Sequence, residues 1–280
     1  MSMVVDGPEL SHFRTPISPE MMLIHSRCLG VAKSGEATLE AVLVALKNGY
    51  RHIDTAQFYG NEADVGKAVR ESGIPREEIF VTTKLWQTDQ GYEKCLLRFE
   101  TSLKQLGLDY VDLYLVHSPL SAERLDTWRA MEQLLQSGKA RSIGVSNYGI
   151  HHLKELFDNC KVRPSCNQLE LHPYSTRTEL VSFCQKEGIV LEAYTPLTLG
   201  QKLNDPGVVE IAKRYNKSTA QLLIKWCLQK GFVVLPKSVT PSRIIENISV
   251  FDFEISKEDI AKLDSFDEYL VTHWDPTTAP

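Results

Sequence analysis

The feature that most constrains this sequence is a short apolar run followed by a stretch of helical periodicity, a pattern that recurs along the chain. The apolar runs fall near residues 28–32, 50–54, 79–84, 111–117, 140–146, 164–170, 189–194 and 232–236. The helical stretches between them cover residues 37–48, 62–72, 91–106, 123–137, 149–159, 177–187 and 206–230. Strands that alternate with helices predict a parallel sheet, and eight such strands can close into a barrel. We therefore expect an α/β fold, a single (β/α)8 TIM barrel domain over residues 1–280.

Capping signals indicate where the later helices begin. Ser218 and Gln221 form a capping box within the stretch 206–230. After the eighth apolar run, Thr240–Pro241 and Ser256 are typical helix starts, which predicts extra C-terminal helices. Residues 1–24 show no clear period, and we expect an irregular N-terminal segment there.

A doubly wound open sheet is the alternative to a barrel, because it also alternates strands with helices. Dinucleotide-binding folds of that kind carry Gly-x-Gly-x-x-Gly directly after a strand. No apolar run here is followed by that spacing, and GVSNYG at 144–149 does not match it. The alternation by itself leaves this alternative open.

The composition limits the partners that the protein can have. With 36 acidic and 31 basic residues, the formal net charge of -5 gives no reason to expect nucleic acid or an anionic membrane as a partner. No apolar run approaches the roughly 18 residues of a membrane span. The six cysteines include no Cys-x-x-Cys pair, which indicates reduced thiols. We expect a cytoplasmic protein, and a monomer because no self-complementary apolar stripe is visible.

Four polar side chains lie at the ends of neighbouring apolar runs. Asp54 and Tyr59 are five positions apart in GYRHIDTAQFYGNE, Lys84 ends IFVTTK, and His117 ends VDLYLVH. The carboxyl ends of parallel barrel strands share one rim, where such barrels place their chemistry. We therefore expect the four side chains to meet there.

Together these side chains suit proton transfer to oxygen. A phenol with a pKa of about 10 is a weak acid near neutrality. A lysine ammonium about 4 Å away favours the phenolate by about 4 kcal/mol at an effective dielectric of ~20, less whatever burial takes back. Asp54 would keep Lys84 charged, and a neutral His117 would orient a bound carbonyl oxygen. No side chain supplies a hydride, so a nicotinamide cofactor is its natural source.

Several segments resemble the aldo-keto reductase superfamily, in particular its small aldehyde and 2,5-diketo-gluconate reductase-like members. They are, in family order between about residues 36 and 275, GYRHIDTAQFYGNE, TKLW, DLYLVHSP, GVSNY, NQLELHPY, LEAYTPL and LPKSVTPSRIIEN. The resemblance implies a barrel that binds NADP(H) across its rim without a doubly wound fold. It also implies a catalytic tetrad of Asp54, Tyr59, Lys84 and His117, with Tyr59 as the general acid/base.

The resemblance also assigns the contacts to the nicotinamide. Its carboxamide would be held by Ser146, Asn147 and Gln168, and its ring would stack on Tyr194. Each of these residues also has an ordinary structural reading, such as a turn for Ser146–Asn147 and a core position for Tyr194.

A second group of residues matches the adenosine-phosphate site of the family. It consists of Lys237, Ser238, Arg243 and Asn247, with Glu246 where an adenine contact is usual. The residues themselves agree, because a helix that begins at Thr240–Pro241 offers free N–H groups to an anion. Two cations nearby suit a 2′-phosphate. We therefore expect NADPH/NADP+ rather than NADH as the cofactor.

Substrate and metal contacts are less well defined by the sequence. Trp86 and Trp274, with His117, are candidate substrate-binding residues, although both tryptophans could equally be ordinary packing. Glu170 and His172 could join the rim residues as metal ligands. No dense ligand cluster supports a metal site, and we expect none.

The chain departs from the family pattern at its first strand. Residues 21–33 read MMLIHSRCLGVAK, where many members have a Met-Pro hairpin and a Gly-Leu-Gly run. Either the strand starts near Cys28 or the barrel floor is built differently, and both suggest a more open pocket. The segment after His117 and the tail are short, so we expect broad specificity toward small aldehydes, dicarbonyls or keto-sugars.

The leading hypothesis is an NADPH-dependent carbonyl reductase. The rival is an NADP(H)-binding regulatory subunit of the same superfamily, which senses the cofactor and has vestigial turnover. A barrel impaired by its unusual first strand is a third possibility. The sequence names neither the physiological carbonyl nor the direction of the reaction in the cell.

Overall fold

Eight parallel strands form one sheet in the order of the sequence, as seen in a computed structural model that describes residues 28–30 and 35–280. The strands are β1 (Cys28–Gly30), β2 (His52–Asp54), β3 (Phe80–Leu85), β4 (Leu113–Val116), β5 (Ile143–Ser146), β6 (Cys166–Glu170), β7 (Val190–Tyr194) and β8 (Val233–Leu235). A parallel bridge joins Gly30 to Lys237, just beyond β8, so the sheet nearly closes on itself. The predicted TIM barrel is confirmed. The predicted irregular segment 1–24 lies outside the described residues.

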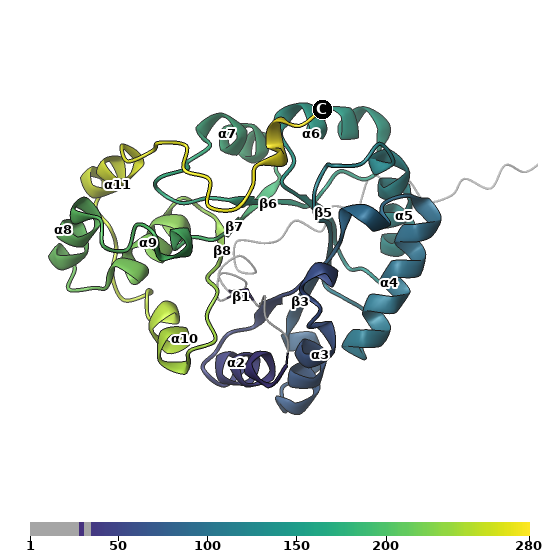
Figure 1. Cartoon of the computed structure of the whole chain (residues 1–280), viewed down its shortest axis with the longest axis horizontal. Coiled ribbons are helices and arrows are strands. Elements are labelled where there is room, and N and C mark those ends of the chain that lie inside the picture. The colour runs from purple at the N-terminus through teal and green to yellow at the C-terminus, as the bar shows by residue number, and fades with distance from the viewer. Residues whose placement is uncertain (1–27, 31–34) are drawn as a thin grey trace, which may run out of the picture.

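Helices surround the strands (Figure 1). They are α2 (Glu36–Lys47), α3 (Glu62–Glu71), α4 (Tyr92–Leu106), α5 (Arg124–Gln136), α6 (Ile150–Asn159), α7 (Thr178–Lys186), α8 (Pro206–Arg214), α9 (Thr219–Gln229), α10 (Pro241–Ile248) and α11 (Lys257–Asp264). The last two are the extra C-terminal helices that the sequence predicts. Ser218 caps α9 together with Gln221, and Ser256 caps α11 by accepting from the N–H of Asp259.

One predicted helix is wrong in its extent. The stretch 206–230 is two helices, α8 and α9, because the chain turns between Arg214 and Thr219. Asn216 adopts a left-handed conformation there (φ 53°), which ends α8, and the Ser218 cap then begins α9. Both helices have apolar residues with the same period, so the pattern continues across the turn.

The core has one layer inside the barrel and another between the strands and the helices. Leu113, Leu115 and Cys166 form a buried cluster against Phe80 and Val190, and Val233 and Leu235 form a second against Val190 and Tyr194. These residues come from alternate strand positions, as expected for an interior filled by side chains. The outer layer is the large cluster that joins the helices to the sheet. Strands covered on both sides explain why the apolar runs are continuous rather than alternating.

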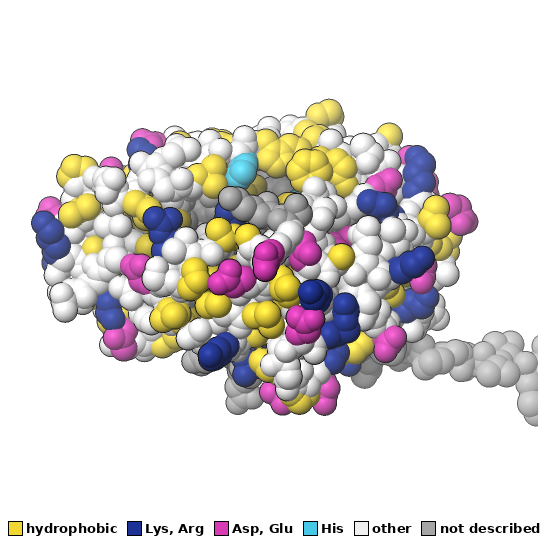
Figure 2. Space-filling model, turned by 60° about the horizontal axis from the view of Figure 1, so that its bottom comes forward, with side chains coloured by type: hydrophobic (Ala, Val, Ile, Leu, Met, Phe, Trp, Pro, Cys, Tyr) yellow, Lys and Arg dark blue, Asp and Glu magenta, His cyan; other side chains and the backbone are white. Residues whose placement is uncertain are grey.

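The surface carries charges of both signs. Basic and acidic side chains are interspersed over the face shown in Figure 2, and hydrophobic side chains gather there beside a hollow. Among the described residues, no helix combines the length and the apolar character that crossing a bilayer requires.

Candidate active site

The four predicted rim residues lie together at the carboxyl ends of β2 to β4. Asp54 ends β2, Tyr59 lies in the short 3-10 turn Gln57–Tyr59 that follows, Lys84 is in β3, and His117 comes directly after β4. The Lys84 Nζ is 2.5 Å from the Asp54 Oδ1 and 5.1 Å from the centre of the Tyr59 ring. The Tyr59 and His117 rings are 5.8 Å apart and nearly perpendicular.

Burial and neighbouring charges set the protonation of the site. Burial alone would lower the pKa of Lys84, but Asp54 and Tyr59 more than offset it and raise that pKa, so the ammonium stays charged. Burial and the charge of Lys84 hold the pKa of His117 well below its usual range, so its imidazole is neutral. The Nδ1 atom of this ring is buried without a hydrogen bond to any described group.

Lys84 acts to lower the pKa of Tyr59 as expected, but burial outweighs it. Although the tyrosine is partly exposed, burial of its phenol is the larger influence and raises the pKa, while Lys84 acts in the opposite direction. The negative charge of Asp54 adds to the effect of burial. The ammonium therefore limits the rise rather than producing a net decrease.

The predicted nicotinamide residues form a connected group beside the rim. The Ser146 Oγ donates to the backbone oxygen of Gln168 at 2.9 Å, and the Asn147 Nδ2 donates to the backbone oxygen of His117 at 3.1 Å. The Tyr194 hydroxyl donates to the Asn147 Oδ1 at 2.8 Å. Asn147 has a left-handed backbone (φ 63°). Asparagine tolerates this conformation better than most residues do.

A cavity of about 360 Å³ opens over these residues. Its walls include both predicted tryptophans, and Trp86 lies 5.1 Å from the ring of His117 and 6.1 Å from that of Trp274. Phe58 stacks on Trp86 at 4.0 Å and is 60% exposed, so the mouth of the cavity is aromatic. Phe58, Leu199 and His273 also line it, and the sequence reasoning missed them.

The predicted adenosine-phosphate residues lie on and just before α10. Lys237 lies two residues after the end of β8 and lines the cavity, and Ser238 is buried and accepts from the N–H of Thr240 at 3.1 Å. Thr240 is the N-cap of α10, but its side chain makes no capping hydrogen bond. Exposed Arg243, half-buried Glu246 and buried Asn247 lie on the helix itself.

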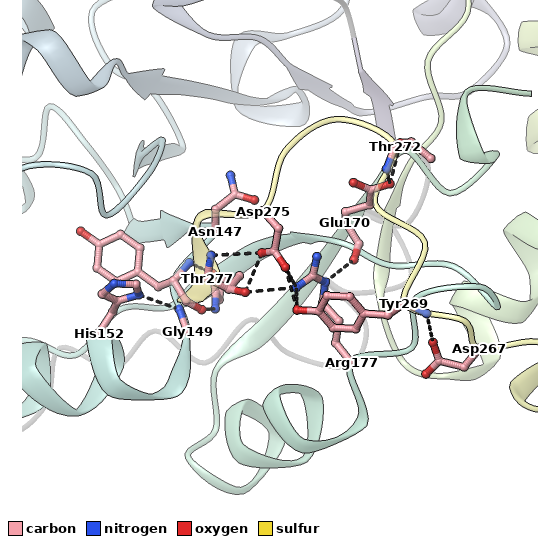
Figure 3. Close-up of polar contacts among 12 residues, drawn as sticks. Asn147, Gly149, His152, Glu170, Arg177, Asp267, Tyr269, Thr272, Asp275 and Thr277 are labelled. Carbon is pink, nitrogen blue, oxygen red and sulfur yellow. Dashed lines mark hydrogen bonds and ion pairs between the residues drawn. The ribbon is translucent and has the colours of Figure 1, made fainter. Parts of the chain in front are cut away.

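A buried polar network ties down the C-terminal strap, residues 267–280, which carries Trp274 (Figure 3). The Glu170 Oε1 accepts from the N–H of Thr272 at 2.9 Å, from the Thr272 Oγ1 at 2.5 Å, and from the His172 Nε2 at 3.1 Å. The Arg177 Nη1 lies 3.0 Å from the Asp275 Oδ2. These contacts fix the strap on both sides of Trp274.

The same network gives Glu170 and His172 hydrogen-bond partners within the protein. The two side chains hydrogen-bond to each other, and Glu170 also accepts from the hydroxyl of Thr272 in the strap. No group of three or more metal-ligating side chains is placed to hold an ion within residues 28–30 and 35–280. The strap anchors could have been suspected from Glu170, since a carboxylate in an apolar strand needs buried partners.

Comparison with known proteins identifies the group to which this architecture belongs. The model of the aldo/keto reductase family matches residues 28–268. The chain belongs to the aldo/keto reductase family. A glyoxal reductase of Bacillus subtilis is 50% identical over 242 residues, which cover 86% of this chain and 88% of the relative.

Solved aldo-keto reductases share the fold. One from a deep-sea metagenome library has a TM-score of 0.87 and 46% sequence identity, covering 90% of this chain and 94% of the other. An aldo-keto reductase of Bombyx mori in complex with NADP has a TM-score of 0.82 and 36% identity, covering 89% and 91% of the two chains.

Proposed function

We propose that this family member is an NADPH-dependent reductase of small aldehydes and ketones, including dicarbonyls and keto-sugars, with Tyr59 as the general acid. The observation that carries the proposal is the meeting of Tyr59, His117 and the Lys84–Asp54 pair at one cavity. A purely structural role would require only that the polar atoms of these groups have hydrogen-bond or ion-pair partners within the protein. Here the Tyr59 phenol and the His117 ring both line the open cavity, where a substrate can reach them.

Each of the four side chains has its own role in proton transfer. Bound NADPH supplies the hydride to the carbonyl carbon. Tyr59 donates a proton to the carbonyl oxygen as negative charge develops there. Lys84, held charged by Asp54, stabilises the phenolate that remains. His117 is neutral, so a ring nitrogen can hydrogen-bond the substrate oxygen and orient it.

The cofactor roles follow the positions of the predicted residues. Ser146, Asn147 and Gln168 would hold the nicotinamide carboxamide, and Tyr194 would offer its ring as a stacking surface. All four lie next to the tetrad, which supports a ring placed within reach of the substrate carbon.

At the other end of the cofactor, α10 offers an anion site. Its first N–H groups have no side-chain cap, so they are available to a phosphate. Lys237 and Arg243 would supply charge for the 2′-phosphate, Ser238 would add a hydroxyl, and Glu246 and Asn247 would contact the adenosine. This set favours NADPH over NADH.

The cavity supports a small substrate. Its volume is about 360 Å³. That is near the lower end of ligand pockets, which span roughly 300 to roughly 1000 Å³, and the nicotinamide ring would take part of this volume. Trp86 and Trp274 provide apolar walls, and the name of the Bacillus relative points to glyoxal as a first substrate to test. We further propose a cytoplasmic monomer; the free thiols of Cys95, Cys166 and Cys227 fit a reducing compartment.

The test is the initial rate of NADPH consumption with glyoxal, glyceraldehyde and a bulky ketone, each repeated with NADH. We expect turnover with both small aldehydes, little with the bulky ketone, and a clear preference for NADPH. Tight NADPH binding without turnover of any carbonyl would contradict the proposal and favour the cofactor-sensing subunit instead.

A further inference from the structure

Glu192 is a buried carboxyl inside the barrel, and it has no role in the proposed mechanism. It lies in β7, only 2% exposed, and its register partners are Gln168 on β6 and Val233 on β8. The residues at alternate positions of the same strand, Val190 and Tyr194, pack on the apolar interior clusters. A carboxyl in such a place costs free energy unless its partners compensate, so its contacts are informative.

Its hydrogen-bond partner is the amide of Gln168. The Gln168 Nε2 donates to the Glu192 Oε2 at 2.8 Å and to the Asp54 Oδ2 at 2.9 Å. An amide nitrogen has two hydrogens, and an ionised carboxylate can only accept. Two carboxylates on one side therefore use both hydrogens of Gln168 and turn its Oε1 away from them. Gln168 also lines the cavity, so this oxygen is left for a ligand there.

We propose that Glu192 is a positioning residue for the cofactor: it accepts the second amide hydrogen of Gln168 and so presents the Gln168 Oε1 to the N–H₂ of the nicotinamide carboxamide. This inference rests on the proposed function, because it takes Gln168 as a nicotinamide contact. Asp54 alone leaves one amide hydrogen unpaired, and the amide can then turn. Glu192 removes that freedom without touching the cofactor.

The charges around Glu192 make its contact with Gln168 sensitive to pH. Burial, and next the negative charge of Asp54 on β2, raise the pKa of Glu192 to about 7, while Gln168 and Lys84 on β3 oppose the rise. The nearby thiol of Cys166 on β6 is neutral, because burial holds its pKa well above the usual range. Near neutrality Glu192 therefore exchanges between its acid and its carboxylate.

The two forms of Glu192 act differently on Gln168. The carboxylate accepts from the Nε2 and fixes the amide as described. The acid has an O–H that can donate to the Gln168 Oε1 and so competes with the Asp54 carboxylate, which accepts from the Nε2; the amide is then no longer held in one orientation. Cofactor affinity should therefore rise as the pH rises through about 7.

The experiment measures the dissociation constant of NADPH by quenching of tryptophan fluorescence between pH 6 and 8.5. The variants are Glu192→Gln and, as a matched control, Glu62→Gln. Glu62 is likewise 2% exposed, but its carboxylate accepts from Thr83 and Ser102. The 2′-phosphate of the cofactor also titrates near pH 6, and the control shares that contribution.

We expect Glu192→Gln to bind NADPH about tenfold more weakly than the wild type at pH 8, the scale of one charge-assisted hydrogen bond. The difference should shrink toward pH 6, and Glu62→Gln should follow the wild type. Equal affinities of Glu192→Gln and the wild type over the whole range would overturn the inference. If the wild type itself fails to bind NADPH, the proposed function fails instead.

A second measurement needs no variant and covers the case in which Glu192→Gln does not fold. Titration of the wild type labelled with ¹³C at glutamate carboxyls should show one buried glutamate with a pKa near 7. Saturation with NADPH should lower the pKa of that glutamate, because the bound cofactor favours the carboxylate. A pKa that is the same with and without NADPH would count against the inference.

Discussion

Replacing Arg177 by methionine should loosen the C-terminal strap and leave the barrel folded. The change removes the ion pair between the Nη1 and the Asp275 Oδ2 (3.0 Å), in which the two side chains are only 4% and 13% exposed. It also removes hydrogen bonds to the Thr277 Oγ1 at 3.2 Å and to the backbone oxygen of Glu170 at 3.2 Å. Truncating one member of a buried pair costs roughly 3–5 kcal/mol, because the other charge is left unpaired.

The lost free energy destabilises the closed position of the strap, which can open without unfolding the barrel. A loss of roughly 3–5 kcal/mol increases the open population by about 10²- to 10³-fold or more. Hydrogen exchange of the strap amides measures this opening directly. A suitable probe is Leu270, whose N–H donates to the backbone oxygen of Tyr174 at 2.8 Å. The KM for the carbonyl should rise because the strap carries Trp274, with a smaller change in kcat.

The matched control is Arg129→Met. Arg129 pairs with Asp126 on α5, but the two side chains are 65% and 53% exposed. An exposed pair of this kind is worth at most about 1 kcal/mol. Exchange at Leu270 that is equally fast in the Arg177→Met variant and the wild type would refute the reasoning. Acceleration spread evenly over the barrel would also refute it, because it would mean global destabilisation.

Acid should release the strap in the same way. Burial would raise the pKa of Asp275, but its contacts with Thr277, Tyr269 and Arg177 prevail and lower it. A carboxyl with a lowered folded-state pKa stabilises above its unfolded pKa of about 3.9, and this contribution is lost as the pH falls through the folded-state value.

Three further predictions concern the site itself. Lys84→Met should lower kcat by about 10²-fold or more with little change in NADPH affinity. It should also destabilise the fold by roughly 3–5 kcal/mol in urea unfolding, since Asp54 loses its buried partner; an unchanged kcat would contradict the role. Arg243→Ala should weaken NADPH binding in calorimetry but spare NADH, and equal weakening of both would exclude a 2′-phosphate contact. The pKa of His117 is lower in the folded protein than in the unfolded chain. Below about pH 6.5 the unfolded chain therefore binds a proton that the folded protein does not, and the free energy of unfolding decreases. In His117→Asn the urea midpoint should therefore vary less between pH 6.5 and 5, and the same variation as in the wild type would refute this.

The barrel and its rim could be predicted because both depend on local patterns. Strands covered on both sides require continuous apolar runs, and polar residues that end such runs stand out, as Lys84 and His117 do. The parallel order of the strands then places them at one edge.

What could not be predicted depends on how deeply a side chain is buried and on partners that are distant in the sequence. Glu192 occurs in an apolar run, but the run alone does not tell which side chains face the barrel interior, nor that Gln168 would meet both Glu192 and Asp54. The net direction of the Tyr59 pKa shift could not be predicted for the same reason, because the sequence shows the nearby charge and not the extent of burial. The strap anchors pair Arg177 with residues about a hundred positions away.

The central claim is that Tyr59 supplies the proton, and Tyr59→Phe tests it most directly. The variant removes one hydroxyl and keeps the ring, so NADPH affinity and thermal stability should match those of the wild type. Stopped-flow measurement of NADPH oxidation on mixing the loaded enzyme with glyoxal should then show the single-turnover rate reduced by about 10²- to 10⁴-fold. A near-normal rate with normal NADPH binding would mean that the proton comes from another group, and the account of the site would be wrong.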